Sequence, residues 1–352
     1  MKDDRPIASL SIDVDNRWAY LRAAGRADWK SATTYLPMVM DRVVDTLGAV
    51  GLPVTAFLVG RDLVDETDIR AIESLSQLSR WEFGNHSLNH LPWMHTLSRE
   101  QIHEEIRVPH DRLLNCLGYR PRGFRGPGFS CPPQVLAELA DAEYAYDASI
   151  FPTSMAPIAR AVFLARTRLK GAERERAKKL YGGFAAMRQP NVPFRRRVES
   201  MDTMLWETPV TVMPVFRTPI HFSYLIFLAS FSVPLAKGYY RSALAMCRRC
   251  GVPPSLLLHP PDFLGVEDRS ELDHLPGMKM RRESKLRFVS WALRVLAEQF
   301  DVVTIAAQID RLNGTDNPLM PESSNTTPAT ACDVEERLAA TGGKEVGVVS
   351  NA

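Results

Sequence analysis

The chain has 352 residues, of which 45% are hydrophobic and 24% are charged, a composition typical of a soluble globular protein with a large core. Its formal net charge of +2 argues against nucleic acid as the main partner. The five cysteines are few and odd in number, which argues against a framework of disulfide bonds.

Strands and helices are predicted to alternate along most of the chain. The charged residues 1–6 lead into the first strand without the apolar stretch of a signal peptide, so we expect a cytoplasmic protein. Short apolar stretches predict eight strands, at residues 7–13, 54–59, 81–86, 123–125, 144–147, 205–212, 255–259 and 301–305. Apolar residues at helical spacing predict helices at residues 38–50, 69–78, 135–142 and 286–299. Another helix begins at a capping box at Ser98, and Pro109 is expected to kink or split it.

This alternation predicts an α/β protein with a mostly parallel sheet covered by helices. Eight strands in roughly 300 residues favour a distorted (β/α) barrel of about seven to eight strands over an open sheet. Polar residues fall at or just past the C-terminal ends of predicted strands, where such a barrel builds its active site. These residues are Asp13, Asp15, His86, Arg125, Asp147 and His259.

Two regions depart from the repeat. Residues 151–203 form a long basic insertion, and residues 218–236 contain no Asp, Glu, Lys or Arg. The uncharged segment reaches the lower length limit of a membrane span, but its prolines and histidine argue against one. We expect it either to cap the barrel, which we favour, or to dip into the interface of a bilayer. One barrel domain is thus expected over residues 1–312, with a helical, partly hydrophobic insertion, followed by a disordered tail over 313–352.

Two short motifs indicate the chemistry. Asp13 and Asp15 are two residues apart, so they point to the same face of a strand. His86 and His90 are four apart and are expected on one face of a helical turn. Two imidazoles and one carboxylate fill three positions of a divalent metal ion and leave a position for water. The other carboxylate is then available as a base for that water.

Five motifs in order resemble those of the polysaccharide deacetylases with a NodB homology domain, carbohydrate esterase family 4. They are residues 11–15, 86–90, 124–128, 146–149 and 256–259. The second, from His86 to His90, matches the family pattern His-Ser/Thr-x-x-His fully. The first has a spaced Asp-x-Asp in place of the commoner adjacent pair, and Gly128 stands where many members have tyrosine.

The resemblance implies a distorted barrel and one divalent metal ion, usually zinc. It implies Asp15, His86 and His90 as the metal ligands. It also implies Asp13 as the catalytic base and His259 as the catalytic acid.

Three further residues are expected beside the catalytic groups. The resemblance implies that Arg125 orients or tunes Asp13, and a structural salt bridge is the alternative for this arginine. Gly128 has no Cβ, so it lets a substrate approach closely, and its N–H could complete an oxyanion hole. Asp147 is expected to contact the substrate or to support residues that do, although a role in a turn or helix cap is equally open.

These observations predict a metal-dependent hydrolase that removes an N-acetyl or N-formyl group from an amino sugar. The uncharged segment 218–236 and the basic insertion would suit a lipid-linked biosynthetic intermediate and a peripheral contact with the membrane. One alternative is an amide or ring hydrolase acting on a small non-sugar substrate, like the allantoinase-like relatives of the family. The other is a carbohydrate-binding protein without catalytic activity.

Overall fold

The computed structural model describes residues 5–158, 187–268 and 277–314, together with residues 161, 164, 171, 175, 271–273 and 275. The middle of the predicted insertion at 151–203 and nearly all of the predicted tail lie outside the described residues.

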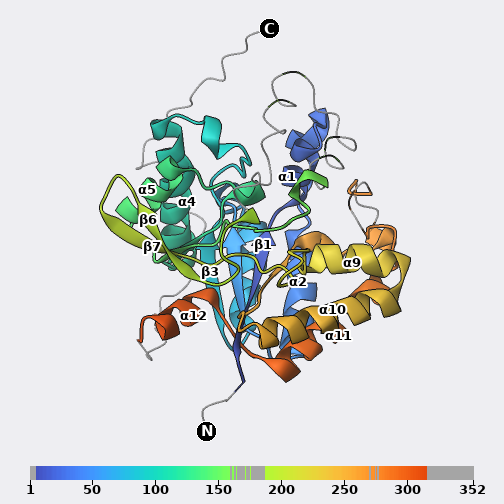
Figure 1. The fold of residues 1–352 in the computed structure, drawn as a ribbon. Coiled ribbons are helices and arrows are strands. Elements are labelled where there is room, and N and C mark those ends of the chain that lie inside the picture. Colours follow the sequence, from blue (N-terminus) through green and yellow to red (C-terminus); the bar gives the residue numbers. More distant parts are fainter. Residues whose placement is uncertain are drawn as a thin grey trace. The chain divides into compact units, whose positions relative to one another are not determined.

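Strands and helices alternate as the sequence predicts (Figure 1). The strands are β1 (Ile7–Val14), β2 (Val54–Leu58), β3 (Trp81–Asn85), β4 (Gly123–Phe124), β5 (Tyr146–Asp147), β6 (Phe194–Val198), β7 (Thr203–Glu207), β8 (Ser255–Leu258) and β9 (Asp301–Val303). The first helices are α1 (Arg17–Ala23), α2 (Leu36–Gly48), α3 (Glu66–Glu73), α4 (Arg99–Leu117) and α5 (Pro133–Asp141). The later helices are α9 (Phe222–Phe231), α10 (Val233–Arg249), α11 (Arg282–Gln299) and α12 (Ile305–Leu312).

The nine strands of the described chain form one sheet in the order β6-β7-β5-β4-β3-β2-β1-β8, and β9 also pairs with β1. Every pairing is parallel except that of β6 with β7. The α/β class with a mostly parallel sheet is therefore confirmed. Parallel strands place their C-terminal ends at one edge, which is where the predicted polar residues lie.

The chain after β7 bridges the two ends of the sheet. The backbone N–H of Val210 donates to the carbonyl of Ile150, and that of Thr211 donates to the carbonyl of Ser255 at the start of β8. The predicted strand 205–212 is thus too long, since β7 ends at Glu207 and the following residues run as an extended connection. This segment therefore links the chain just after β5 to β8.

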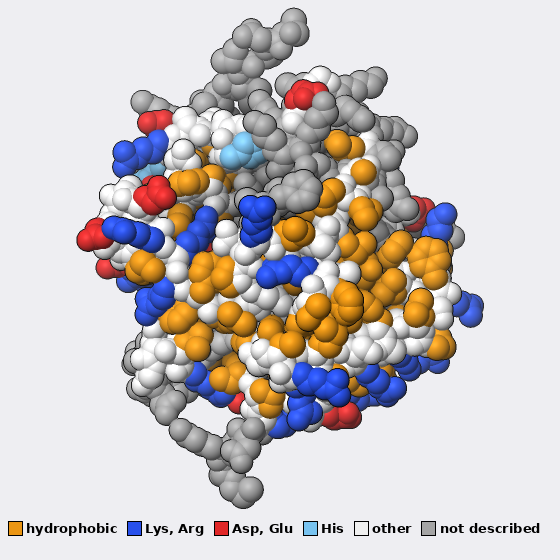
Figure 2. All heavy atoms as spheres, viewed as in Figure 1, with side chains coloured by type: hydrophobic (Ala, Val, Ile, Leu, Met, Phe, Trp, Pro, Cys, Tyr) orange, Lys and Arg blue, Asp and Glu red, His pale blue; other side chains and the backbone are white. Residues whose placement is uncertain are grey.

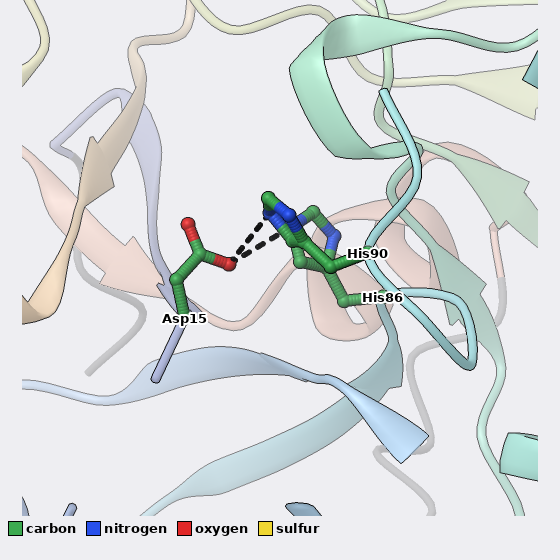
Figure 3. Close-up of side chains that lie close together, drawn as sticks. All are labelled: Asp15, His86 and His90. Atoms are coloured by element: carbon green, nitrogen blue, oxygen red, sulfur yellow. Dashed lines mark ion pairs between the residues drawn. The ribbon is translucent and has the colours of Figure 1, made fainter. Parts of the chain in front are cut away.

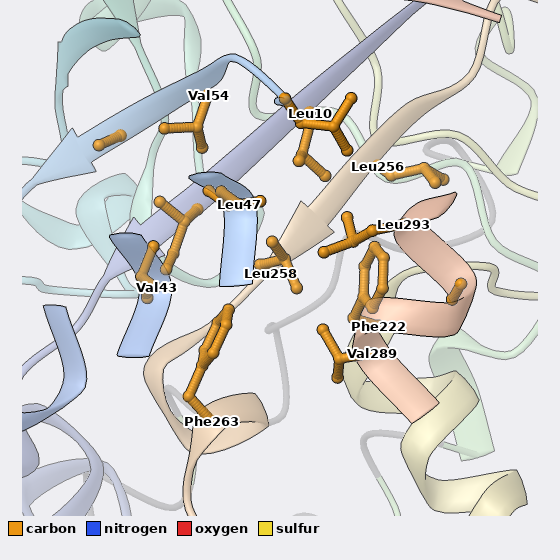
Figure 4. Close-up of a cluster of buried hydrophobic side chains, with 14 of the residues drawn as sticks. Leu10, Val43, Leu47, Val54, Phe222, Leu256, Leu258, Phe263, Val289 and Leu293 are labelled. Atoms are coloured by element: carbon orange, nitrogen blue, oxygen red, sulfur yellow. The ribbon is translucent and has the colours of Figure 1, made fainter. Parts of the chain in front are cut away.

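The main hydrophobic core lies between the central strands and the helices on one side of them. Leu10 of β1 and Leu258 of β8 face apolar side chains of α2, α9 and α11, including Val43, Phe222 and Leu293 (Figure 4). All five side chains are fully buried. The uncharged segment 218–236 supplies part of this core, because the inner face of α9 is buried. None of the helices in the described part of the chain has the length and apolarity needed to cross a bilayer.

One local expectation was wrong. The insertion is not purely helical, since β6 lies within it and pairs with β7 as an antiparallel edge. Of the two outcomes expected at Pro109, a split does not occur, because α4 runs through it from Arg99 to Leu117, and a kink stays a prediction. Pro109 has no N–H, so the carbonyl of Glu105 lacks a helical donor. The backbone N–H of Leu88 donates to that carbonyl instead, at 2.9 Å.

Candidate metal centre

Strand register brings the first and last motifs together. In the β1–β8 pair, Ile12 lies opposite Leu258. The next residues along the two strands are Asp13 and His259, which therefore meet at the edge of the sheet. Oδ2 of Asp13 lies 3.9 Å from Nε2 of His259. The two residues predicted as base and acid thus face each other across the site.

The pairing of β3 with β4 places the second motif beside the third. Asn85 lies opposite Phe124, so His86 adjoins Arg125. Nδ1 of His86 lies 2.6 Å from the backbone carbonyl of Arg125. Because a carbonyl can only accept, this contact assigns a proton to Nδ1. In the neutral ring, Nε2 then turns its lone pair toward the aspartates.

Asp15, His86 and His90 converge on one point (Figure 3). Oδ1 of Asp15 lies 3.3 Å from Nε2 of His86 and 3.0 Å from Nε2 of His90. The three ligand atoms all lie within 4.8 Å of one another. Asp15 and His86 are buried, whereas His90 is half-buried. Two histidines and a carboxylate are a donor set that can hold a divalent metal ion.

The residues present fit a cation at this point. Oδ1 of Asp15 is buried and accepts no well-aligned hydrogen bond from the described residues. It faces the lone pair of His86, and two buried acceptors are stable so close together only with a proton or metal ion between them. Burial alone raises the pKa of Asp15, but His90 and His86 outweigh it and hold that pKa well below its usual value. The site therefore favours a carboxylate that stays charged.

The two histidines come together through a loop and not through the expected helical turn. Ser87 and His90 adopt left-handed backbone conformations, with φ of 64° and 51°. The side chain of Asn85 accepts from the backbone N–H of Ser87, and Oγ of Ser87 accepts from that of His90. These side-chain contacts replace the backbone bonds of a helix. A spacing of four residues was thus correct for proximity but not for secondary structure.

Helix α4 holds this loop from behind. The carboxylate of Glu105 accepts from the backbone N–H of Asn89 at 2.9 Å and from its side-chain amide at 2.7 Å. The carbonyl of Glu105, which Pro109 leaves without a helical donor, accepts from Leu88. One residue of α4 therefore fixes two consecutive residues between His86 and His90. The sequence analysis did not predict this support. The one signal in the sequence was Pro109, because a proline inside a helix leaves the carbonyl four residues earlier free to accept another hydrogen bond.

Arg125 lies behind Asp13 and not on the surface of the site. Its side chain is fully buried, with Nη1 at 2.7 Å from Oδ1 of Asp13 and 2.9 Å from Oγ of Ser11. Nε donates to the carbonyl of Ala148, and the guanidinium stacks over the ring of Phe57 at 4.3 Å. Arg125 thus orients one oxygen of Asp13 and leaves the other, Oδ2, toward the histidines.

His259 is held by residues that the sequence analysis did not assign. Its Nδ1 lies 3.2 Å from Oγ of Ser223, which donates to Oδ1 of Asp262 at 3.0 Å. Oδ2 of Asp262 accepts from the backbone N–H of His259 at 2.9 Å. Behind this turn, Nζ of the buried Lys285 donates to the carbonyl of Pro261. Nε2 of His259 remains directed at Asp13.

The loop after Arg125 depends on glycine. Gly128 has a φ of 59°, and a Cβ on Gly126 would lie only 1.9 Å from the carbonyl oxygen of Ser130. The backbone N–H of Gly126 donates to Oγ of Ser149, which in turn donates to Asp147. Asp147 is fully buried, so it supports this loop from within.

Asp147 also belongs to a buried pair of carboxyl groups. Burial and the neighbouring Asp147 raise the pKa of Glu207 well above its usual value, which favours a proton shared by the two groups. Nη1 of Arg196 lies 3.2 Å from Asp147 and 3.4 Å from Glu207. Arg196 comes from β6, the strand that the sequence analysis missed.

Comparison with known proteins agrees with this arrangement. A family model described as polysaccharide deacetylase matches residues 31–146, which include the His86–His90 loop and Arg125. No curated protein matches the chain.

Among solved structures, the chain is similar to a Mycobacterium smegmatis protein described as a candidate polysaccharide deacetylase. The two share 15% identity over 93% of this chain and 97% of that one, with a TM-score of 0.57. It is also similar to Puue allantoinase, at 13% identity over 90% of this chain and 94% of that one, with a TM-score of 0.54. At such identities the likeness concerns the fold. The family-model match shows that residues 31–146 are similar to the polysaccharide deacetylase family.

Proposed function

We propose that the protein is a metal-dependent hydrolase that removes an N-acyl group, acetyl or formyl, from an amino sugar. The observation that carries the proposal is the meeting of Asp13 with both the metal-ligating group and His259. Oδ2 of Asp13 lies 3.8 Å from Nε2 of His86 and 3.9 Å from Nε2 of His259. A base and an acid thus flank one site for a divalent ion.

Asp15, His86 and His90 would hold the ion, which we propose to be zinc. When bound, such an ion lowers the pKa of a water molecule and polarises a carbonyl group. Asp13, oriented by Arg125, takes a proton from the attacking water. His259 donates a proton to the leaving nitrogen, because an amine leaves poorly as an anion. The backbone N–H of Gly128 donates to the oxygen that gains negative charge.

The proposal includes a lipid-linked form of the amino sugar and a cytoplasmic location. Aromatic side chains support the lipid-linked form, since they continue from the Gly128 loop to the uncharged helix α9. Phe129 contacts Phe151, which contacts His221 at the start of α9, with ring centroids 4.9 and 5.2 Å apart. Burial and the nearby His259 lower the pKa of His221 to about 3, so this ring is neutral.

A screen by mass spectrometry tests the reaction. The zinc-loaded protein is incubated with N-acetyl and N-formyl amino sugars in free, nucleotide-linked and polyprenyl-phosphate-linked forms. We expect loss of the acyl mass from a sugar, and a much slower loss with Asp13→Asn. Hydrolysis of small cyclic or linear amides without any turnover of sugars would contradict the proposal. Binding of sugars without turnover by the metal-loaded protein would contradict it as well.

A further inference from the structure

The outer face of α9 and its neighbours exposes apolar side chains that no described residue covers. The turn before α9 exposes Val215 by 79% and Phe216 by 63%. The corner between α9 and α10 exposes Phe231 by 73% and Leu235 by 59%. We call these four residues, together with Val233, Tyr224 and Phe227, the apolar ridge. Figure 2 shows hydrophobic side chains gathered over this face of the molecule.

The ridge is continuous along α9. Tyr224, Phe227 and Phe231 follow one another at helical spacing, with ring centroids 6.2 and 5.0 Å apart. The opposite face of the same helix is buried in the core, so α9 is apolar all round while only half of it is packed. A helix of this kind is stable when its second face also meets an apolar medium.

The segment that carries the ridge has charges of one sign only. Residues 208–261 contain no aspartate or glutamate. They contain five cations, of which Lys237, Arg241 and Arg248 share one side of α10 by their spacing. Basic side chains form a rim below the ridge in Figure 2. Apolar side chains bordered by cations complement a surface of acyl chains under negatively charged headgroups.

From these observations we propose that the apolar ridge docks on an anionic lipid surface, with Phe231 and Leu235 entering the acyl region. A second protein would match the apolar side chains but would need acidic groups opposite the rim. A second copy of this chain would bring its own cations against that rim, so lipid is the occupant that both features favour.

Docking would also orient the site. The rings of His221 and Tyr224 lie 6.4 Å apart, which joins the ridge to the row that begins at Phe129 beside Gly128. Ser223, at the start of α9, contacts His259. The N-terminal turn of the helix proposed to meet the lipid therefore contacts the proposed catalytic histidine, His259. This orientation suits a lipid-linked amino sugar, a step that rests on the proposed function.

Vesicle flotation of the full chain tests docking without any substrate. We expect flotation with vesicles of equal phosphatidylglycerol and phosphatidylcholine, little with phosphatidylcholine alone, and weakening with added salt. The double variant Phe231→Ser/Leu235→Ser should lower binding by roughly 10-fold or more. The matched control Val64→Ser/Leu312→Ser removes side chains exposed by 53% and 49% elsewhere and should bind like wild type.

A second measurement guards against a variant that misfolds. Brominated anionic lipids should quench the fluorescence of the tryptophan introduced by Phe231→Trp. They should not quench that of the tryptophan introduced by Leu312→Trp. Absence of flotation for wild type would overturn the proposal, as would equal loss in the control variant. Self-association that Phe231→Ser/Leu235→Ser abolishes, without vesicle binding, would show that the ridge joins two copies. Because Asp13→Asn should still float, failure of docking and failure of the proposed reaction are separate outcomes.

Discussion

Nη1 of Arg125 lies 2.7 Å from Oδ1 of Asp13, and both side chains are buried. The arginine makes further side-chain contacts to Oγ of Ser11 and to the carbonyl of Ala148. In this geometry the two carboxylate oxygens of Asp13 have different partners. Oδ1 anchors the residue, and Oδ2 faces the histidines.

Arg125→Met should destabilise the protein more than any change at the surface. Removing one partner of a buried ion pair leaves an uncompensated charge and typically costs about 3–5 kcal/mol. Thermal or urea unfolding of the metal-free protein measures this cost. The double variant Asp13→Asn/Arg125→Met should recover part of it, because no lone buried charge remains. Equal destabilisation in the single and double variants would show that packing, not charge, sets the effect.

Asp13→Asn should keep the metal ion and lose activity. Asparagine preserves the shape of the side chain but cannot take a proton, so we expect kcat to fall by roughly 10²-fold or more. Metal analysis alongside kinetics on the substrate found by the screen checks both halves. Loss of the metal in this variant would show that Asp13 is a metal ligand, and Asp15 would then be the candidate base.

His86→Ala should abolish stoichiometric metal binding. It removes one of the three proposed ligands and the contact with the carbonyl of Arg125. The matched control is His103→Ala, since His103 lies exposed on α4 and pairs with Glu138. Elemental analysis of the purified proteins should give about one zinc per chain for wild type and control. Equal metal content in His86→Ala would refute the ligand assignment.

His259→Ala should slow amide hydrolysis far more than ester hydrolysis. An amine must be protonated as it leaves, whereas an activated aryl oxide leaves without help. We expect a loss of about 10²–10⁴-fold on the amide and a much smaller loss on an aryl acetate. Ser223→Ala, which removes the contact at Nδ1 and the hydrogen bond to Asp262 but keeps the imidazole, should fall between wild type and His259→Ala. Parallel losses on amide and ester would argue for a binding role.

Glu105→Ala should weaken the metal site from a distance. Glu105 touches no proposed ligand, but its carboxylate fixes Asn89 between His86 and His90. The bond from Leu88 to the backbone carbonyl of residue 105 remains in the variant. Removal of such a supporting group typically costs about 10–100-fold in metal affinity. Competition with a chelator measures the affinity. The neighbouring Glu104, which is exposed, provides the control Glu104→Ala. Unchanged affinity in Glu105→Ala would show that the loop holds its shape alone.

Local patterns were sufficient for most strands and for the two short motifs. The apolar stretch before Asp13 is β1, and the stretch before His86 is β3. Both predictions depend on neighbours in sequence, because a buried interior strand is rich in apolar residues over its short length. The same patterns failed for β6, whose Phe-Arg-Arg-Arg-Val sequence looks like a basic loop. An edge strand needs only one buried face, so its sequence need not be apolar.

The sequence by itself determined the α/β class, the parallel strands and the spacing of Asp13, Asp15, His86 and His90. These features arise from burial and side-chain direction, which act over a few residues. Only the tertiary structure showed which residues support the site residues through hydrogen bonds. Glu105 reaches Asn89, Ser223 reaches His259 and Asp147 reaches the Gly126 loop through contacts between distant segments. Such contacts depend on how helices pack on the sheet, and no local pattern of residues encodes that packing.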